Sequence, residues 1–340
     1  MSSSTSSFDT PVHAVRALLT GVVLSLLVLG AAELSFRRAG LRPSVPNTAS
    51  RWGDELRRGA DDPDGLFLVG SSRFQTTLIP GVMSQEVSRN VYNLSMDDNN
   101  PLPYLEYIAY KTQLNGVVLI EGMPLRLFAP DEDSLQKSYK TLVGAAPLKV
   151  SEPLDNQLGA VFYGRLVILH PSLRLREIFG NLYTNRRLPY AHVSMDADRS
   201  LGIDFTRLSD SFFAAGVAKV HAEAASHRYL SDEALSARLK RYEDAIQAIK
   251  ARGGAVVVFR PPASGAYLEM ERSLYPTSLW WARRLPRNID CSVSFESFDI
   301  FKEFKYPDGS HPDMRDRERL TRVIADALSR QCGALFKPKT

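Results

Sequence analysis

The sequence predicts a three-layer α/β/α domain, built around a parallel sheet and preceded by one N-terminal membrane-spanning helix. Two observations carry this prediction. Short apolar runs alternate with amphipathic stretches of helical length, which is the pattern of a parallel sheet covered by helices on both faces. In addition, residues 17–32 (ALLTGVVLSLLVLGAA) contain no charge, and with their flanks they are long enough to cross a bilayer.

The N-terminal region divides into parts of different composition. These parts are a small polar start expected to be disordered (1–11), a membrane anchor or signal sequence (12–36) and a linker (37–62). The linker contains a short predicted helix around Asp54–Arg58. Gly30-Ala31-Ala32 looks like a signal-peptidase site, but only His13 and Arg16 supply positive charge before the apolar segment. An uncleaved anchor is therefore favoured over a cleaved signal.

Five apolar runs are predicted as strands and three amphipathic stretches as helices. The strands are Leu66–Val69, Val91–Leu94, Val117–Ile120, Ala255–Phe259 and Val293–Ile300. The helices are Pro103–Gln113, Asp232–Ala251 and Met314–Arg330. Residues 130–230 break the alternation of strand and helix. They are predicted to form a long, mostly helical insertion that acts as a lid or a substrate wall.

Composition limits the classes of function. Of the 340 residues, 44% are hydrophobic and 24% charged, as in an ordinary folded protein. The net charge of +4 is too small to indicate nucleic-acid binding, so no nucleic-acid partner is expected. Cys291 and Cys332 are too few and too far apart for a zinc site, and no metal is expected. They are either two buried thiols or one disulfide, which requires an oxidising compartment.

Polar residues that follow the predicted strands should meet at one edge of the sheet, where open parallel sheets bind ligands. Ser72 follows the first strand, and Asp308 and His311 follow the fifth. A serine becomes a nucleophile when a base takes its proton and a third group orients that base. Asp308 and His311 are three residues apart, so one short loop can present both. The sequence therefore predicts a Ser72–His311–Asp308 triad, although a serine turn or a helix cap would explain each motif alone.

These motifs resemble sequence blocks of the SGNH (GDSL) hydrolases. Gly70-Ser71-Ser72 resembles block I, with Ser72 at the nucleophile position, and Asp308-x-x-His311 resembles block V. A Gly-Ser-Ser variant behind one membrane segment is similar to the branch of the teichoic-acid D-alanylation and alginate-type O-acetylation proteins. The resemblance covers roughly residues 62–130 and 230–332. It implies a flavodoxin-like domain over residues 63–340.

The resemblance also implies a function. We expect a serine esterase or O-acyltransferase that acts on acyl esters of a cell-surface polysaccharide, without a cofactor, beside a membrane-bound O-acyltransferase. The catalytic domain would lie outside the cytoplasm, anchored in the inner (cell) membrane. Arg37, Arg38 and Arg42 conflict with this placement, since positive charges favour the cytoplasmic side and only Arg16 precedes the segment. The alternatives are an esterase or lipase of small esters, and a non-catalytic accessory subunit.

Two residues that help build the oxyanion hole in this family are missing here: the block II glycine and the block III asparagine. Either Asn99, Asn100 or the N–H of Gly122 replaces them, or the site is weakened. Arg73 and Arg260 also follow strands, and a guanidinium group can hold a substrate carboxylate or phosphate with two hydrogen bonds. The alternative for both arginines is a structural pairing within the protein.

A disulfide between Cys291 and Cys332 follows from the expected geometry. Cys291 precedes the fifth strand, at the edge of the sheet opposite the predicted triad. The last helix should run antiparallel to that strand, and from Met314 to Cys332 it would span about 27 Å at 1.5 Å per residue. Cys332 should therefore return close to Cys291. Two reduced thiols remain the alternative.

Overall fold

The computed structural model describes residues 11–145, 152–173, 180, 183 and 191–336. The helices are α1 (Pro11–Arg38), α2 (Ala49–Gly59), α3 (Ser72–Thr77), α4 (Pro80–Val87), α5 (Pro101–Lys111), α6 (Pro124–Leu127), α7 (Glu132–Ala145), α8 (Glu152–Tyr163), α10 (Asp210–Ser226), α11 (Asp232–Lys250), α12 (Gly265–Leu274), α13 (Trp280–Arg284) and α14 (Arg317–Cys332). Short 3₁₀ helices are η1 (Val167–Leu169), η2 (Phe295–Ser297), η3 (Asp299–Glu303) and η4 (Gly333–Leu335). The strands are β1 (Leu66–Val69), β2 (Val91–Asn93), β3 (Val117–Glu121), β4 (Val193–Met195), β5 (Leu201–Ile203), β6 (Ala255–Arg260) and β7 (Cys291–Ser294).

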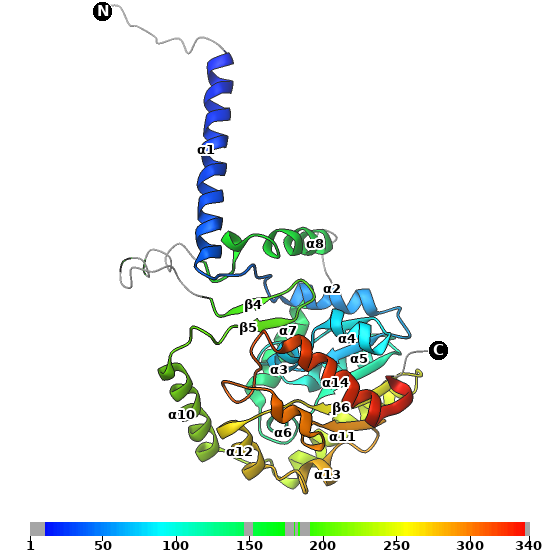
Figure 1. Cartoon of the computed structure of the whole chain (residues 1–340). Coiled ribbons are helices and arrows are strands. Elements are labelled where there is room, and N and C mark those ends of the chain that lie inside the picture. Colours follow the sequence, from blue (N-terminus) through cyan, green and yellow to red (C-terminus); the bar gives the residue numbers. More distant parts are fainter. Residues whose placement is uncertain (1–10, 146–151, 174–179, 181–182, 184–190, 337–340) are drawn as a thin grey trace, which may run out of the picture.

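The central sheet has the strand order β2-β1-β3-β6-β7, and every neighbouring pair is parallel. This is the flavodoxin-like order, in which the chain leaves the first strand in one direction and then crosses back to the other side. The predicted fold class, an α/β domain with a parallel sheet, is confirmed. Figure 1 shows helices packed around the sheet and α1 projecting from the globular part.

Alternate residues of β1 enter two separate cores, one on each face of the sheet. Phe67 and Val69 pack into the core formed with α2, α5, α7 and α11. Leu66 and Leu68 pack into the core formed with α4 and α14. All four side chains are buried, as expected of a strand covered on both faces. The sheet is thus the middle layer, and the helices that cover each core form the two outer layers.

The predicted linker (37–62) differs in the structure, because most of it belongs to the domain. Trp52 on α2 is completely buried, and its Nε1–H donates a hydrogen bond to the carbonyl of Leu94, at 2.8 Å. The N–H of Val45 donates to the carbonyl of Met195, at 2.9 Å. The short helix predicted around Asp54–Arg58 lies within α2, which begins earlier, at Ala49; the polar composition of this stretch concealed its buried face.

The predicted fifth strand (293–300) is shorter than expected and begins earlier, as β7. Beyond it, phenylalanines recur every third residue, at 295, 298, 301 and 304. A spacing of three matches the 3₁₀ helix, in which residues three apart lie above one another, and η2 and η3 fill this stretch. The insertion also contains an antiparallel ribbon, β4 with β5, in addition to its helices. The expected disorder of residues 1–11 lies outside the described residues, except for Pro11, where α1 begins.

One helix of the described chain, from His13 to Arg38, is long and apolar enough to cross a membrane. Most of its apolar side chains are exposed, and it extends away from the globular part (Figure 1). Among the described residues, the last turns of α1 contact the domain. There Phe36 packs with Leu41 and Val167 in a small apolar cluster.

Candidate active site

The turn after β1 gives its two serines different surroundings. Gly70 is required here, since a Cβ would lie 2.8 Å from that of Glu121 and 2.9 Å from the Phe74 ring. Ser71 is buried and caps α3, its Oγ accepting a hydrogen bond from the N–H of Arg73 at 3.4 Å. Ser72 is the first residue of α3 and is only half-buried.

The loop that carries Asp308 and His311 is held from the adjacent strand. Gly309 has a φ of 86°, in the left-handed region that favours glycine. Its carbonyl accepts a hydrogen bond from the N–H of Ser264, at 2.9 Å, and the Ser264 Oγ donates to the carbonyl of Tyr306, at 3.2 Å. Ser264 follows β6, so this loop is fixed to the carboxyl edge of the sheet.

Ser72, His311 and Asp308 form a continuous hydrogen-bonded chain. The Oγ of Ser72 lies 3.0 Å from Nε2 of His311, and Nδ1 of His311 lies 2.7 Å from Oδ2 of Asp308. The other carboxylate oxygen of Asp308 accepts the backbone N–H groups of Ser310 and His311, at 2.9 and 2.8 Å. The Oγ of Ser310 is also 3.0 Å from His311 Nδ1. The structure thus brings together the three side chains that the sequence singled out.

The surroundings of Asp308 favour its charged form. Burial acts to raise the pKa of Asp308, but the hydrogen bond and charge of His311 act against it. Together with the backbone N–H groups of Ser310 and His311, they hold the pKa of Asp308 below its usual value. A charged Asp308 can orient the imidazole and stabilise it when protonated.

The residues expected to replace the missing oxyanion donors make hydrogen bonds within the protein, which favours the other expectation, a weakened oxyanion hole. The Asn100 side chain caps α5 through the N–H of Leu102, at 3.0 Å, and donates to Asp131. Asn99 donates to the carbonyl of Asp97, at 2.7 Å. The N–H of Gly122 donates to the carbonyl of Phe259, at 2.7 Å, which extends the β3–β6 pairing. The Asn100 amide and the Gly122 N–H thus use all their hydrogens within the protein, whereas the Asn99 amide has one acceptor for its two hydrogens among the described residues.

Arg73 and Arg260 are both buried and share one carboxylate, the structural alternative that the sequence left open. Glu271 on α12 accepts from Arg73 at 2.9 Å and from Arg260 at 3.2 Å, and its side chain is completely buried. Arg73 also donates to the carbonyls of Pro261 and Pro262, at 2.8 Å each, and Arg260 pairs with Glu296 at 2.6 Å. This network ties the residue after Ser72 to α12.

Glu121, at the end of β3, binds the backbone of the turn that carries Ser71 and Ser72. Its Oε2 accepts the N–H of Ser71 at 2.7 Å, while Oε1 has no hydrogen-bond partner among the described residues. Burial raises the pKa of Glu121, although nearby Arg73 and the hydrogen bonds from Ser71 act to lower it. The sequence allows Glu121 to be a pocket carboxylate or, more often, the partner of an arginine such as Arg73; its hydrogen bond in the structure is to the Ser71 backbone instead. The only signal for Glu121 was a carboxylate that ends an apolar strand.

Two cavities share Glu223 and Tyr267 as lining residues, and one of them is also lined by Asp308 and His311. The His311 cavity, of about 350 Å³, contains Asp308, Ser310 and His311 on one side and apolar residues of α10 on the other. Those apolar residues are Phe212, Phe213, Val217 and Val220.

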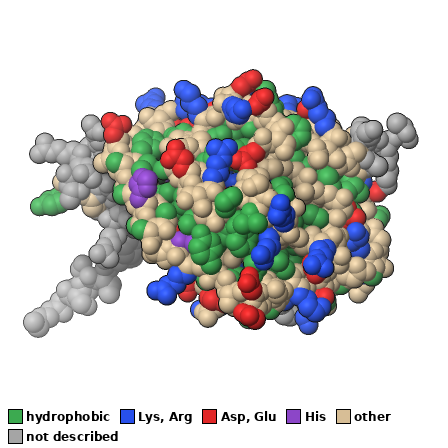
Figure 2. All heavy atoms as spheres, turned by 90° about the horizontal axis from the view of Figure 1, so that it is seen from below, with side chains coloured by type: hydrophobic (Ala, Val, Ile, Leu, Met, Phe, Trp, Pro, Cys, Tyr) green, Lys and Arg blue, Asp and Glu red, His purple; other side chains and the backbone are tan. Residues whose placement is uncertain are grey.

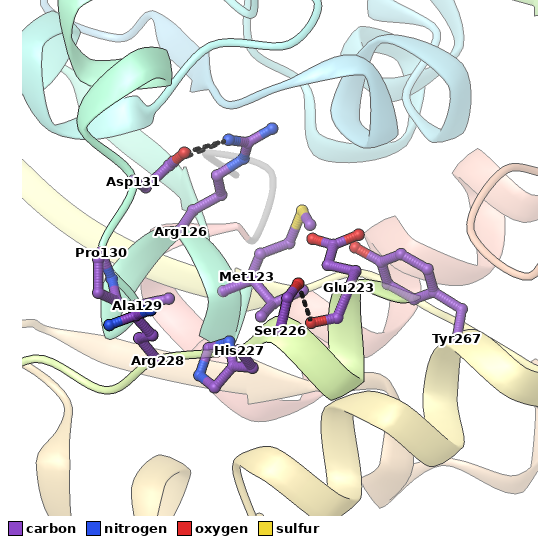
Figure 3. Close-up of a pocket in the computed structure, with 11 residues that line it drawn as sticks. Met123, Arg126, Ala129, Pro130, Asp131, Glu223, Ser226, His227, Arg228 and Tyr267 are labelled. Carbon is purple, nitrogen blue, oxygen red and sulfur yellow. Dashed lines mark hydrogen bonds and ion pairs between the residues drawn. The ribbon is translucent and has the colours of Figure 1, made fainter. Parts of the chain in front are cut away.

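The second space, the His227 cavity, measures about 320 Å³ and is more polar. Figure 3 shows it with Glu223 and Tyr267 on one side and the Arg126–Asp131 ion pair on the other. The insertion therefore supplies a wall of both cavities through α10. The sequence predicted such a wall but named none of its residues.

The cysteines meet at the opposite edge of the sheet. Cys291 begins β7 and Cys332 ends α14, and the structure joins them in a disulfide with Cα atoms 5.7 Å apart. Among the described residues, no three His, Cys, Asp or Glu side chains gather as a metal-binding group.

Comparisons with known proteins add little to this geometry. No known protein-family model matches the chain, and no curated protein matches it by sequence. Among solved structures, a crystal structure of TesA is similar at 11% identity and a TM-score of 0.32, covering 78% of this chain and 99% of that one. We draw no argument from a likeness this distant. The site is interpreted from its own geometry.

Proposed function

We propose that this protein is a membrane-anchored, extracytoplasmic serine esterase or O-acyltransferase, with Ser72 as nucleophile, His311 as general base and Asp308 as the residue that orients His311. The observation that carries the proposal is the hydrogen-bonded chain from Ser72 through His311 to Asp308, at 3.0 and 2.7 Å. Those distances lie within the reach that proton transfer requires. The half-buried position of Ser72 leaves it accessible to a substrate.

The proposed reaction has two halves. Ser72 Oγ attacks the carbonyl carbon of an ester while His311 Nε2 takes the hydroxyl proton. The ester C–O bond then breaks, and His311 gives the proton to the leaving oxygen, which leaves an acyl group on Ser72. Water or a sugar hydroxyl, deprotonated by His311, then attacks the acyl carbon; the bond from that carbon to Ser72 Oγ breaks, and His311 returns the proton to Ser72 Oγ. The N–H of Ser72 has no acceptor within its helix and can face the oxyanion.

The two cavities support a substrate with an apolar and a polar part. The Phe212–Phe213 wall of the His311 cavity suits an acyl group. The polar His227 cavity, with Arg126 and Glu223, suits a hydroxyl-rich acceptor. An acylated cell-surface polysaccharide has both features, and a membrane-bound O-acyltransferase is the partner that would supply the acyl group.

The location rests on α1 and on the cysteine pair. One helix long and apolar enough to span a bilayer precedes the domain, which supports a single-pass anchor. A disulfide between Cys291 and Cys332 supports an oxidising compartment and therefore an extracytoplasmic domain. The arginines that follow α1 argue for the opposite orientation, but one of them, Arg37, is paired with Glu33.

A non-catalytic accessory subunit is the second candidate, and one observation favours it. The side chains and N–H expected to complete an oxyanion hole, those of Asn99, Asn100 and Gly122, are used inside the protein. Losing such a donor lowers kcat by about 100- to 1000-fold in serine hydrolases. A site without these donors could hold a polymer without cleaving it.

Labelling with a fluorophosphonate probe separates the two candidates. The probe should modify the full-length protein in detergent, and Ser72→Ala should abolish the modification. Ser71→Ala is the matched control and should keep it, because Ser71 Oγ caps α3 and has no contact with His311. Absence of labelling in the folded wild type would favour the accessory role. Labelling lost only in Ser71→Ala would show that the nucleophile has been misassigned.

A further inference from the structure

Helix α8 presents an apolar stripe outward. The exposed side chains are Leu154, Leu158, Val161 and Phe162, at 58%, 49%, 47% and 52% exposure. Spacings of four, three and one residue put them on one helical face. Leu166 and Leu169, directly after the helix, are also exposed, so the apolar surface continues along the chain.

The inward face of α8 is less apolar than its outward face. Asn156 points toward α2, where its Oδ1 accepts from the Ser50 hydroxyl at 3.2 Å and its carbonyl accepts from Arg51 at 3.5 Å. Gly159, Ala160 and Tyr163 are half-buried on the same face. A helix on a water-exposed surface has the reverse arrangement, with its apolar face toward the core. The outward stripe therefore calls for an apolar environment.

The position of α8 shows which environment is available. Figure 1 shows α8 lying crosswise at the domain end of α1. The two are joined through η1: the Glu33 carboxylate accepts the N–H groups of Val167 and Ile168, at 3.0 and 2.8 Å. Glu33 lies five residues before the end of α1, so η1 contacts α1 about 7 Å up the helix axis from that end. A bilayer has a headgroup region roughly 5–8 Å thick on each side of its apolar core.

Charged residues near α8 lie where the headgroup region would be. Arg38, Arg42 and Arg165 are exposed around the end of α1 and the end of α8. Arginines at this depth bind anionic headgroups with their guanidinium groups. The opposite face of the molecule carries Lys, Arg, Asp and Glu side chains scattered over it, as a surface in water does (Figure 2).

We propose that the outer face of α8 lies in the lipid of the membrane that α1 crosses, with the apolar stripe at the boundary between headgroups and acyl chains. The inference rests on the anchor part of the proposed function and is independent of the triad. Together, α1 and α8 contact the bilayer at two places. The domain would then have one fixed orientation on the membrane instead of rotating about a flexible tether.

Site-specific quenching tests this contact in the full-length protein, reconstituted into vesicles of phosphatidylcholine and phosphatidylglycerol. Leu158→Cys reports on α8, Leu26→Cys on α1, and Leu279→Cys on an exposed leucine next to α13, far from α1 (Figure 1). Each variant is labelled with a polarity-sensitive fluorophore, and unmodified wild type serves as the blank because both of its cysteines are in the disulfide. Nitroxide lipids then quench whatever lies in the bilayer.

We expect strong quenching at positions 26 and 158 and little at 279, with a contrast of about twofold or more for an interfacial helix. Quenching at 26 but not at 158 would overturn the inference and leave the anchor intact, so that the stripe would need a protein partner. No quenching at either position would refute both the contact and the anchor. Labelling of Ser72 by a fluorophosphonate is scored separately, so the outcome for the enzyme does not affect this test.

Discussion

Two serines stand side by side after β1, and only Ser72 lies against a histidine. Ser71 uses its hydroxyl to cap α3 and its N–H to bind Glu121. The division of roles depends on Glu121, which holds the Ser71 backbone and so fixes the direction in which Ser72 points. A single carboxylate at the end of β3 thus determines which of the two serines faces His311.

Replacing Asp308 by Asn tests the orienting role. The amide can still occupy the space, but it does not supply the charge that favours the reactive tautomer of His311. We expect kcat for ester hydrolysis to fall by about 10⁴-fold, as in other serine triads, with KM little changed. Ser310→Ala, which removes the other group near His311 Nδ1, should cost far less. Equal losses in both variants would mean that Asp308 is not the orienting group.

The lowered pKa of Asp308 also predicts a pH-dependent contribution to stability. A carboxyl with a lower pKa in the folded state stabilises that state above the unfolded pKa of about 3.9. This contribution disappears as the pH falls through the folded pKa. The free energy of unfolding of the wild type should therefore exceed that of Asp308→Asn most at neutral pH, and the difference should shrink below about pH 4. Urea unfolding at several pH values measures it, and a constant difference would contradict the assignment.

The sequence sufficed to single out Ser72, Asp308 and His311, because Ser72 belongs to a short motif directly after β1, and Asp308 and His311 to a short motif in the loop that follows β7, η2 and η3. It did not suffice for Glu271, which lies 198 residues from Arg73 along the chain. The ion pair of Glu271 with Arg73 depends on where α12 packs, and no local sequence pattern predicts that. The roles of Asn99 and Asn100 were hard to predict for a similar reason: their side chains bind nearby backbone groups, which short polar side chains do readily in turns.

At the scale of elements, α2 shows how a polar stretch can belong to a core. Residues 37–62 look like a linker because charged side chains dominate them, yet Trp52 lies completely buried against the Tyr104 ring, with centroids 5.3 Å apart. The strands of the central sheet were easier to predict, since parallel strands buried on both faces are continuous apolar runs. The fifth strand was the exception, because its aromatic residues continue with a period of three.

Trp52→Ala should destabilise the domain strongly. Replacing a large buried aromatic residue by Ala lowers the free energy of unfolding by about 3–5 kcal/mol. The carbonyl of Leu94 would also lose its hydrogen-bond donor. Trp52→Phe is the control, which keeps most of the apolar contact and loses the hydrogen bond. Chemical denaturation of the detergent-solubilised protein gives both values. A loss below about 1 kcal/mol in the Ala variant would show that α2 is only a tether.

The bond between Cys291 and Cys332 joins the start of β7 to the end of α14. The two residues are 41 apart in sequence. On the chain-entropy model, a disulfide that closes a loop of that size stabilises the folded protein by about 4 kcal/mol. Cys291→Ser/Cys332→Ser should lower the free energy of unfolding by an amount of this order. A titration that finds two free thiols in the native protein would refute the bond.

At the scale of the whole molecule, the orientation of α1 decides whether the site can meet a cell-surface substrate. Two observations oppose each other: the arginines after α1 favour a cytoplasmic domain, while the Cys291–Cys332 pair favours an oxidising compartment. Arg37 is engaged by Glu33 and by the carbonyl of Arg165, so it contributes less to the asymmetry than its count implies. We therefore expect the domain outside.

Fusions to reporter proteins decide this orientation. Alkaline phosphatase fused after Thr340 should be active, because that enzyme folds only after export, and a green fluorescent reporter at the same position should stay dark. The matched control places the same phosphatase after His13, ahead of the apolar segment, where it must remain inactive. An inactive phosphatase with a bright fluorescent reporter at Thr340 would place the domain in the cytoplasm. The disulfide would then lack an oxidising compartment and the triad a cell-surface substrate, so this result would overturn the proposed location and, with it, the polysaccharide as substrate.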